Sequence, residues 1–139
     1  MCPRRAQSPA AGAHIVRPQH GCPCEAMGLA QMVNEQAEFW SNVANRYDHV
    51  VDLQIGGATR SILRERVARE GDLGRMVEFG CGTGFYTAVL ASRASTLLAT
   101  DISPGMLEIA KRQVKAANVT FQVEDCQSTS LSDGAFDTA

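Results

Sequence analysis

Apolar side chains in the first half of the chain recur every three or four residues. The members of this stripe are Phe39, Val43, Tyr47 and Val50, with Trp40 and Val51 widening it. Such spacing places the apolar side chains on one face of a helix. The stripe therefore predicts one continuous helix that starts near Asn34 and ends at the glycine pair Gly56–Gly57.

A second helical pattern runs from about Ala58 to Glu70. Its apolar face consists of Ile62, Leu63 and Val67. The charged residues that fall outside this face are Arg60, Arg64, Glu65 and Arg69. This pattern predicts an amphipathic helix, and Gly71 is the residue expected to cap its carboxyl end.

Short apolar runs then alternate with helical patterns. The runs that predict strands are 75–79, 96–101 and 119–124, and residues 136–139 begin a fourth. The helical patterns between them cover 85–94 and a stretch from Ser103, the expected amino-terminal cap, to Asn118. Strands that alternate with helices across short links predict an α/β fold with a parallel sheet.

The turn after the first predicted strand has three glycines at alternate positions, Gly80, Gly82 and Gly84. Glycine permits a tight turn and lets a ligand come close to the backbone. A dinucleotide fingerprint places its third glycine at the sixth position, where this chain has Phe85. The spacing therefore disfavours a nicotinamide dinucleotide (NAD), and a glycine-rich turn without any ligand stays open.

Four segments together resemble a known family. The run Val77–Gly84 resembles motif I of the class I S-adenosylmethionine (SAM) dependent methyltransferases. The run Asp101–Lys111 resembles the family's D-x-S-x-x-M-L-x-x-A motif, and Asp125–Cys126 matches the acidic and small residues after its third strand. Residues 40–48 resemble the helix before the core in the ubiquinone/menaquinone-type and related small-molecule methyltransferases. The resemblance covers about residues 34–139, the first half of a Rossmann-like sheet.

This resemblance implies a SAM site at the carboxyl ends of the first three strands. The residues of the turn that would wrap the amino-acid half of SAM are Gly80, Cys81, Gly82 and Gly84. Glu78 would face the ammonium group of the ligand, directly or through water. Asp101 would accept hydrogen bonds from both ribose hydroxyls, although an acid at a helix start is also common without a ligand.

Most residues that would form the adenine end of the implied site come later in the sequence. Ile102 and Met106 would pack near the adenine, Asp125 would accept from its 6-amino group, and Cys126 would contact the ring. Tyr47 would lie over the pocket. Two structural alternatives stay open, because Met106 also suits the core and Tyr47 also belongs to the apolar stripe.

The implied function is SAM-dependent methyl transfer to a small-molecule or lipid-like acceptor. In this family the general base and the acceptor pocket usually follow the fourth strand, so the sequence assigns no catalytic residue. The alternatives are a non-catalytic truncated fragment, a SAM-binding half that needs a partner and, less favoured, an NAD-binding oxidoreductase domain. An open parallel edge beside the first strand predicts self-association.

The composition of the chain bears on its binding partners and its cellular location. A net charge of −2 indicates no nucleic-acid surface, and no apolar run approaches the roughly 20 residues that cross a bilayer. The five cysteines have irregular spacing, which favours a reducing cytoplasm over a disulfide framework.

The first residues differ from the rest of the chain. Residues 1–26 are rich in proline and lack periodicity, so we expect a disordered extension. Residues 27–139 would then form a partial methyltransferase domain, from a truncated enzyme or half of a split one. Cysteine and histidine are the usual zinc ligands, and the first residues contain Cys2, His14, His20, Cys22 and Cys24. Their spacing fits no common zinc motif, so no metal site is predicted.

Overall fold

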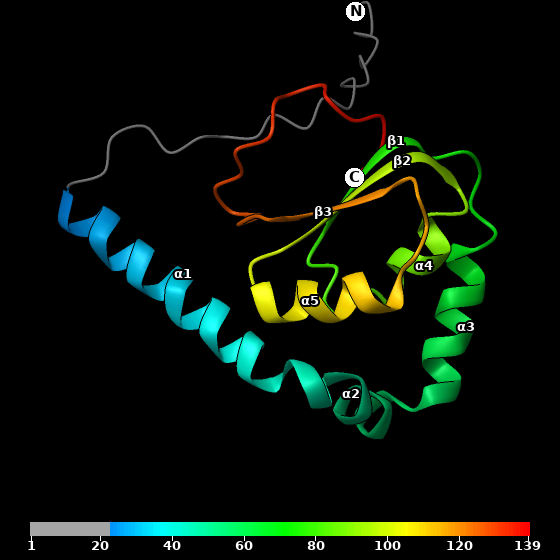
Figure 1. Ribbon diagram of the computed structural model, residues 1–139, viewed down its shortest axis with the longest axis horizontal. Helices are drawn as coiled ribbons and strands as arrows, with labels where there is room; N and C mark the ends of the chain where they lie inside the picture. Colours follow the sequence, from blue (N-terminus) through cyan, green and yellow to red (C-terminus); the bar gives the residue numbers. More distant parts are fainter. Residues whose placement is uncertain (1–22) are drawn as a thin grey trace, which may run out of the picture.

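The computed structural model describes residues 23–139, in which the helices lie on one side of a parallel sheet (Figure 1). Its elements are α1 (Pro23–Val43), the 3₁₀-helix η1 (Ala44–Arg46), α2 (Tyr47–Ile55), α3 (Gly57–Val67), β1 (Gly74–Phe79), α4 (Thr87–Leu90), β2 (Ala94–Asp101), α5 (Pro104–Gln113) and β3 (Val119–Val123). None of the helices in this described part combines the length and the apolar character that a bilayer crossing requires. The boundary predicted at residue 26 stays a prediction, because residues 1–22 lie outside the described residues.

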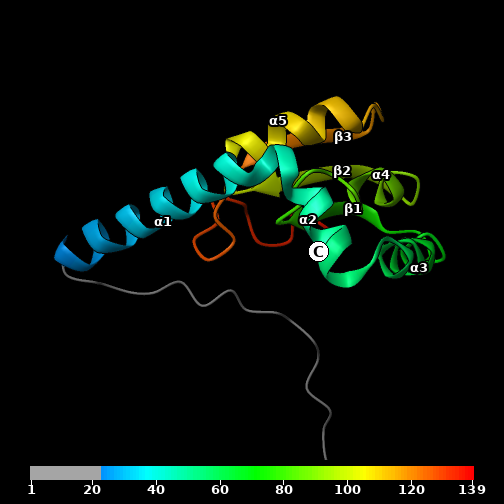
Figure 2. The same cartoon turned by 90° about the horizontal axis from the view of Figure 1, so that it is seen from below.

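The sheet places β2 between β1 and β3, and both pairs of neighbouring strands are parallel. Helices α4 and α5 connect the strands, which confirms the predicted α/β architecture. The expected fourth strand is present as a single parallel bridge between Met76 and Thr138. The Arg75 guanidinium also pairs with the Asp137 carboxylate at 2.8 Å. The segment after β3 thus returns to lie beside β1 (Figures 1 and 2).

The core lies between the sheet and helices α4 and α5. Met76 and Leu97 pack with Ala91 at the end of α4, while Ala99 packs with Leu107 of α5. Leu97 and Leu107 are 1% and 2% exposed. Burial of such a leucine is worth about 1.5–3 kcal/mol, so this layer fixes α5 against β2.

The amino-terminal helices differ from the prediction of one continuous helix. Helix α1 begins at Pro23 rather than near Asn34, and the 3₁₀-helix η1 separates it from α2. A 3₁₀ turn has about 3.0 residues instead of 3.6, so it rotates the apolar stripe out of phase. Phe39 on α1 and Val50 on α2 therefore do not share the single face that the stripe predicts, and they are 55% and 38% exposed.

Helix α3 departs from its predicted faces at three positions, while Arg64, Glu65 and Arg69 are exposed as predicted. Ile62 and Leu63 are exposed, whereas Arg60 is only 4% exposed. The Arg60 guanidinium pairs with the carboxylates of Asp48 at 2.8 Å and Asp52 at 2.9 Å. It also lies 3.9 Å from the centre of the Phe85 ring. Burial opposes the positive charge, but the two carboxylates outweigh it and raise the pKa of Arg60.

Three predicted helix ends are also wrong. Helix α3 ends at Val67, before Gly71, and α4 covers only Thr87–Leu90 of the predicted 85–94. Helix α5 ends at Gln113, and the Asn118 side chain instead donates to the carbonyl oxygens of Ala91 and Ala94. Asn118 therefore ties the start of β3 to the connection between α4 and β2 rather than capping a helix.

Candidate functional site

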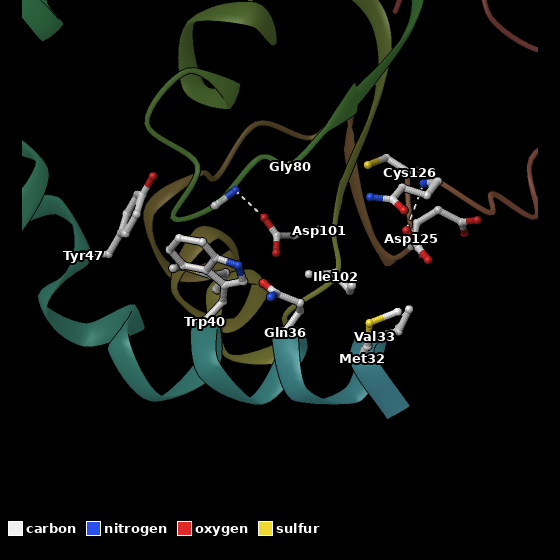
Figure 3. Close-up of a pocket in the computed structure, with 14 residues that line it drawn as sticks. Met32, Val33, Gln36, Trp40, Tyr47, Gly80, Asp101, Ile102, Asp125 and Cys126 are labelled. Atoms are coloured by element: carbon white, nitrogen blue, oxygen red, sulfur yellow. Dashed lines mark hydrogen bonds between the residues drawn. The ribbon is translucent and has the colours of Figure 1, made fainter. Parts of the chain in front are cut away.

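A cavity of about 530 Å³ lies at the carboxyl ends of the three strands (Figure 3). This volume is in the range of small-molecule sites. The residues that line it are Met32, Val33, Gln36, Trp40, Tyr47, Gly80, Gly82, Asp101, Ile102, Met106, Glu124, Asp125, Cys126 and Gln127. The structure thus brings together most of the residues that the sequence predicts for one site.

The glycine turn forms one wall of the cavity. Gly80 and Gly82 have φ angles of 68° and 55°, a region that glycine adopts without strain. A Cβ at Gly80 would meet nothing within 4 Å, whereas one at Gly82 would lie 3.8 Å from the Tyr47 ring. The backbone at Gly80 is therefore open to a ligand, and Tyr47 closes the same turn from the side of α2.

Asp101 ends β2 at the floor of the cavity and is 8% exposed. Its Oδ2 accepts from the backbone N–H of Gly82 at 2.8 Å, and its Oδ1 accepts from that of Ser103 at 2.9 Å. Each carboxylate oxygen has two lone pairs, so both oxygens can accept one more hydrogen bond. The protein thus holds a charged acceptor in a fixed orientation beside the glycine turn.

The loop after β3 contributes the predicted pair Asp125 and Cys126, and also Glu124, which the sequence analysis did not single out. Burial opposes ionisation of Glu124, but the Ser130 backbone N–H, the hydroxyls of Thr129 and Ser130 and the Gln122 amide outweigh it and lower its pKa. The ionised Glu124 therefore organises this loop around the cavity. In the sequence, Glu124 directly precedes the predicted pair Asp125 and Cys126, and nothing there indicated that it organises the loop.

Helix α1 forms the wall that the sequence missed most completely. Met32, Val33, Gln36 and Trp40 extend from this helix toward Ile102 and Asp125 across the cavity (Figure 3). Met32, Gln36 and Trp40 are four residues apart, so they share one helix face. The predicted helix began after Met32, and such spacing does not by itself show whether a helix face meets a ligand.

Met106 and Tyr47 fit both of the alternatives that the sequence left open. Met106 is 2% exposed and lines the cavity, so it belongs to the core and to the site. Tyr47 also lines the cavity while its ring makes an edge contact with Trp40, with centroids 6.0 Å apart.

Glu78, Cys81 and Gly84 do not line the cavity, and their predicted contacts with a cofactor stay predictions. Burial raises the pKa of the Cys81 thiol, and the negative charges of Glu78 and Asp101 raise it further. Cys81 is therefore a neutral, buried side chain. Gly84 packs instead against α5, where a Cβ would lie 3.0 Å from Val114 Cγ2.

Glu78 is held behind the glycine turn, where its Oε2 accepts from the Thr87 hydroxyl at 2.7 Å. Burial raises the pKa of Glu78 above its ordinary value of 4.5, the bond from Thr87 opposes this rise, and the charge of Asp101 adds to it. Folding therefore favours the protonated carboxyl. This contribution to stability is fully present below the unfolded pKa and is lost as the pH rises through the raised pKa.

We expect Glu78→Gln to raise the thermal unfolding midpoint of the ligand-free chain at neutral pH by a few degrees. The neutral amide removes the buried charge, while its oxygen can still accept from Thr87. Thermal unfolding followed by circular dichroism between about pH 4 and 8 would show a flatter pH profile for the variant. Glu108→Gln, at an exposed position of α5, is the matched control. A variant profile parallel to that of the wild type would contradict the assignment.

Among the residues whose side chains are described, no three His, Cys, Asp or Glu side chains are placed to hold a metal ion. The candidate ligands Cys2, His14, His20 and Cys22 lie outside the described residues, and the side chain of Cys24 is likewise not described.

Comparisons with known proteins agree with this geometry. Residues 76–139 match the family described as methyltransferase domain. The chain is 32% identical over 96 residues to the malonyl-acyl carrier protein O-methyltransferase of Bacillus cereus, covering 66% of this chain and 35% of that protein. It is 29% identical over 105 residues to the ubiquinone/menaquinone biosynthesis C-methyltransferase UbiE of Zymomonas mobilis, covering 72% of this chain and 43% of that protein.

Among solved structures, the DhpI–SAH complex matches with a TM-score of 0.56 and 27% identity. This match covers 66% of the present chain and 44% of that chain. The chain thus spans less than half the length of each of these three proteins.

Proposed function

We propose that the cavity of this chain, whose residues 76–139 match the methyltransferase domain family, binds SAM for methyl transfer to a small-molecule or lipid-like acceptor. The observation that carries the proposal is the Asp101 carboxylate, buried beside Gly80 and Gly82 with free acceptor capacity. A buried carboxylate at this position suits the two hydroxyls of a ribose.

The other walls fit the remaining parts of SAM. The apolar side chains of Ile102 and Met106 offer a surface for the adenine, and Asp125 can accept from its amino group. The open backbone at Gly80 leaves room for the amino-acid half. When bound, the cofactor supplies a methyl group on a sulfonium leaving group, so the protein has mainly to align the acceptor and exclude water.

The class of acceptor is inferred from the relatives and from the cavity. The named relatives are methyltransferases of an acyl carrier protein substrate and of quinone biosynthesis. Met32, Val33 and Trp40 give the α1 wall an apolar character that suits an acceptor of low polarity. No side chain is proposed as general base. The free thiols of Cys81 and Cys126 support a reducing, cytoplasmic location as part of the proposal.

A second candidate function is a SAM-binding half that acts with a partner chain. In the described part of the chain, the second edge of β1 is covered only by the short segment 137–138, whose backbone bonds with Arg75 and Val77. An edge of a parallel sheet that only so short a segment covers favours addition of a further strand. Self-association or a partner that supplies further strands would complete such a site.

Isothermal titration of the full chain with SAM tests the proposal, with NAD as the matched control ligand. We expect saturable binding of SAM with one site per chain and no binding of NAD, because Phe85 replaces the glycine of a dinucleotide fingerprint. Gel filtration of the same samples would show whether binding requires an oligomer. Absence of SAM binding in every oligomeric state would contradict the proposed function.

A further inference from the structure

Helix α1 meets the amino-terminal end of α5 through Ser41, Ser103 and Gly105, a contact that we call the serine seam. The hydroxyl oxygens of Ser41 and Ser103 lie 2.8 Å apart. The backbone N–H of Gly105 donates to Ser41 Oγ at 3.3 Å. The first N–H groups of a helix have no partner inside the helix, so α1 supplies part of the cap of α5.

The hydrogen atoms of the seam have one arrangement that satisfies every group. Ser41 Oγ lies 2.7 Å from the carbonyl oxygen of Ala37, which can only accept, so the Ser41 hydroxyl donates there. The Ser103 hydroxyl therefore donates to Ser41 Oγ, while Ser103 Oγ accepts from the backbone N–H of Met106 at 3.1 Å. Loss of the Ser41 oxygen would leave the fully buried Ser103 hydroxyl without an acceptor.

Gly105 makes the seam close-packed. A Cβ at this position would lie 2.9 Å from both Cα and Cβ of Ser41. Such a distance is too short for carbon atoms in contact, so alanine at position 105 would push α1 away from α5. The fit between the two helices, rather than backbone strain, is therefore the reason for glycine here.

The seam is connected to the cavity on both sides. On the α5 side, the backbone N–H of Ser103 donates to Asp101 Oδ1 at 2.9 Å. On the α1 side, Gln36 and Trp40 belong to the cavity wall (Figure 3). We propose that the serine seam positions α1 as a wall of the SAM site, with Ser41 and Gly105 as positioning residues. This inference rests on the proposed function, because it concerns the affinity for SAM.

Gly105→Ala tests the seam through the position of Trp40, which is the only tryptophan of the chain. In the ligand-free variant we expect stronger quenching of Trp40 fluorescence by acrylamide, because α1 moves away from the cavity. The affinity for SAM is expected to fall about tenfold, measured by titration. Ser41→Ala, which removes the hydrogen bonds without a clash, is expected to change both readouts in the same direction.

Two control variants separate positioning from general loss of stability. Gly28→Ala lies on α1, and its Cβ would meet nothing within 4 Å, so both readouts should stay at the wild-type values. Val89→Ala removes core contacts of α4 outside the cavity lining, and it should lower the unfolding temperature without changing the quenching.

Each outcome decides the proposal. Wild-type quenching in both Gly105→Ala and Ser41→Ala would overturn it, and so would an equal rise in Val89→Ala. A rise in quenching with unchanged SAM affinity would overturn the positioning role. Failure of the wild type to bind SAM would reject the proposed function instead, and the quenching series would still test the position of α1. Should Gly105→Ala not fold, Ser41→Ala provides the same test.

Discussion

Gly84→Ala is expected to lower the free energy of unfolding by about 2–5 kcal/mol, a large share of the stability of a small domain. Two costs combine at this position. Its φ of 86° is a left-handed conformation, which costs an alanine about 1–2 kcal/mol. The new Cβ would also lie 3.0 Å from Val114 Cγ2 and 3.2 Å from Ala110 Cα, and overpacking of this kind costs about 1–3 kcal/mol.

Two further glycines make this prediction specific. Gly80→Ala carries the backbone strain without the clash, since its Cβ would meet nothing within 4 Å, and should cost about 1–2 kcal/mol. Gly71→Ala carries neither cost and should change stability by less than about 0.5 kcal/mol. Urea unfolding followed by circular dichroism would rank the three variants. Equal stability of Gly84→Ala and Gly80→Ala would show that the contact with α5 is not tight.

The contrast between Gly80 and Gly84 illustrates what the sequence could establish. The glycine spacing and the short apolar runs are local signals, so they predicted β1, β2 and β3 and placed the turn between β1 and the following helix. The same spacing could not distinguish a glycine that leaves space for a ligand from one that leaves space for α5. That difference depends on Ala110 and Val114, which are distant in the sequence.

Arg60 shows why the amino-terminal helices were harder to predict. Periodicity assigns a charged residue to the exposed face, but burial of an arginine depends on its partners. Here Asp48 and Asp52 come from α2, and Phe85 comes from the glycine turn. The Asp48 carboxylate also accepts from the Thr83 hydroxyl at 2.9 Å, so this network joins α2 and α3 to the site.

The α1 wall of the cavity could not be predicted from the sequence for a similar reason. Met32, Gln36 and Trp40 lie on one helix face, but periodicity cannot reveal whether that face meets a core, a ligand or solvent. The face is oriented by Ser41 and Gly105, whose contact joins two helices far apart in the sequence. Motif I, Asp101 and Asp125 therefore located the cavity, while its remaining wall required the three-dimensional structure.

Asp101→Asn is expected to reduce the affinity for SAM on the order of 100-fold, since hydrogen bonds to a charged group are worth about 1.5–3 kcal/mol each. The amide keeps the size of the side chain but replaces one accepting oxygen with a donor. It can therefore no longer accept from both Gly82 and Ser103 and also from two ribose hydroxyls. Titration with SAM, with the unfolding temperature of each variant as a check on folding, would measure the loss.

Two other aspartates provide graded controls for the charge. Asp125→Asn removes the charge and one of the two accepting oxygens of a side chain that lines the cavity, and should weaken binding by about tenfold or less, because one hydrogen bond is involved. Asp133→Asn changes an exposed acid outside the cavity lining and should leave the affinity unchanged. If a folded Asp101→Asn variant bound SAM as well as Asp133→Asn does, the ribose would have to bind elsewhere. The cavity at the ends of β1, β2 and β3 would then require a different ligand.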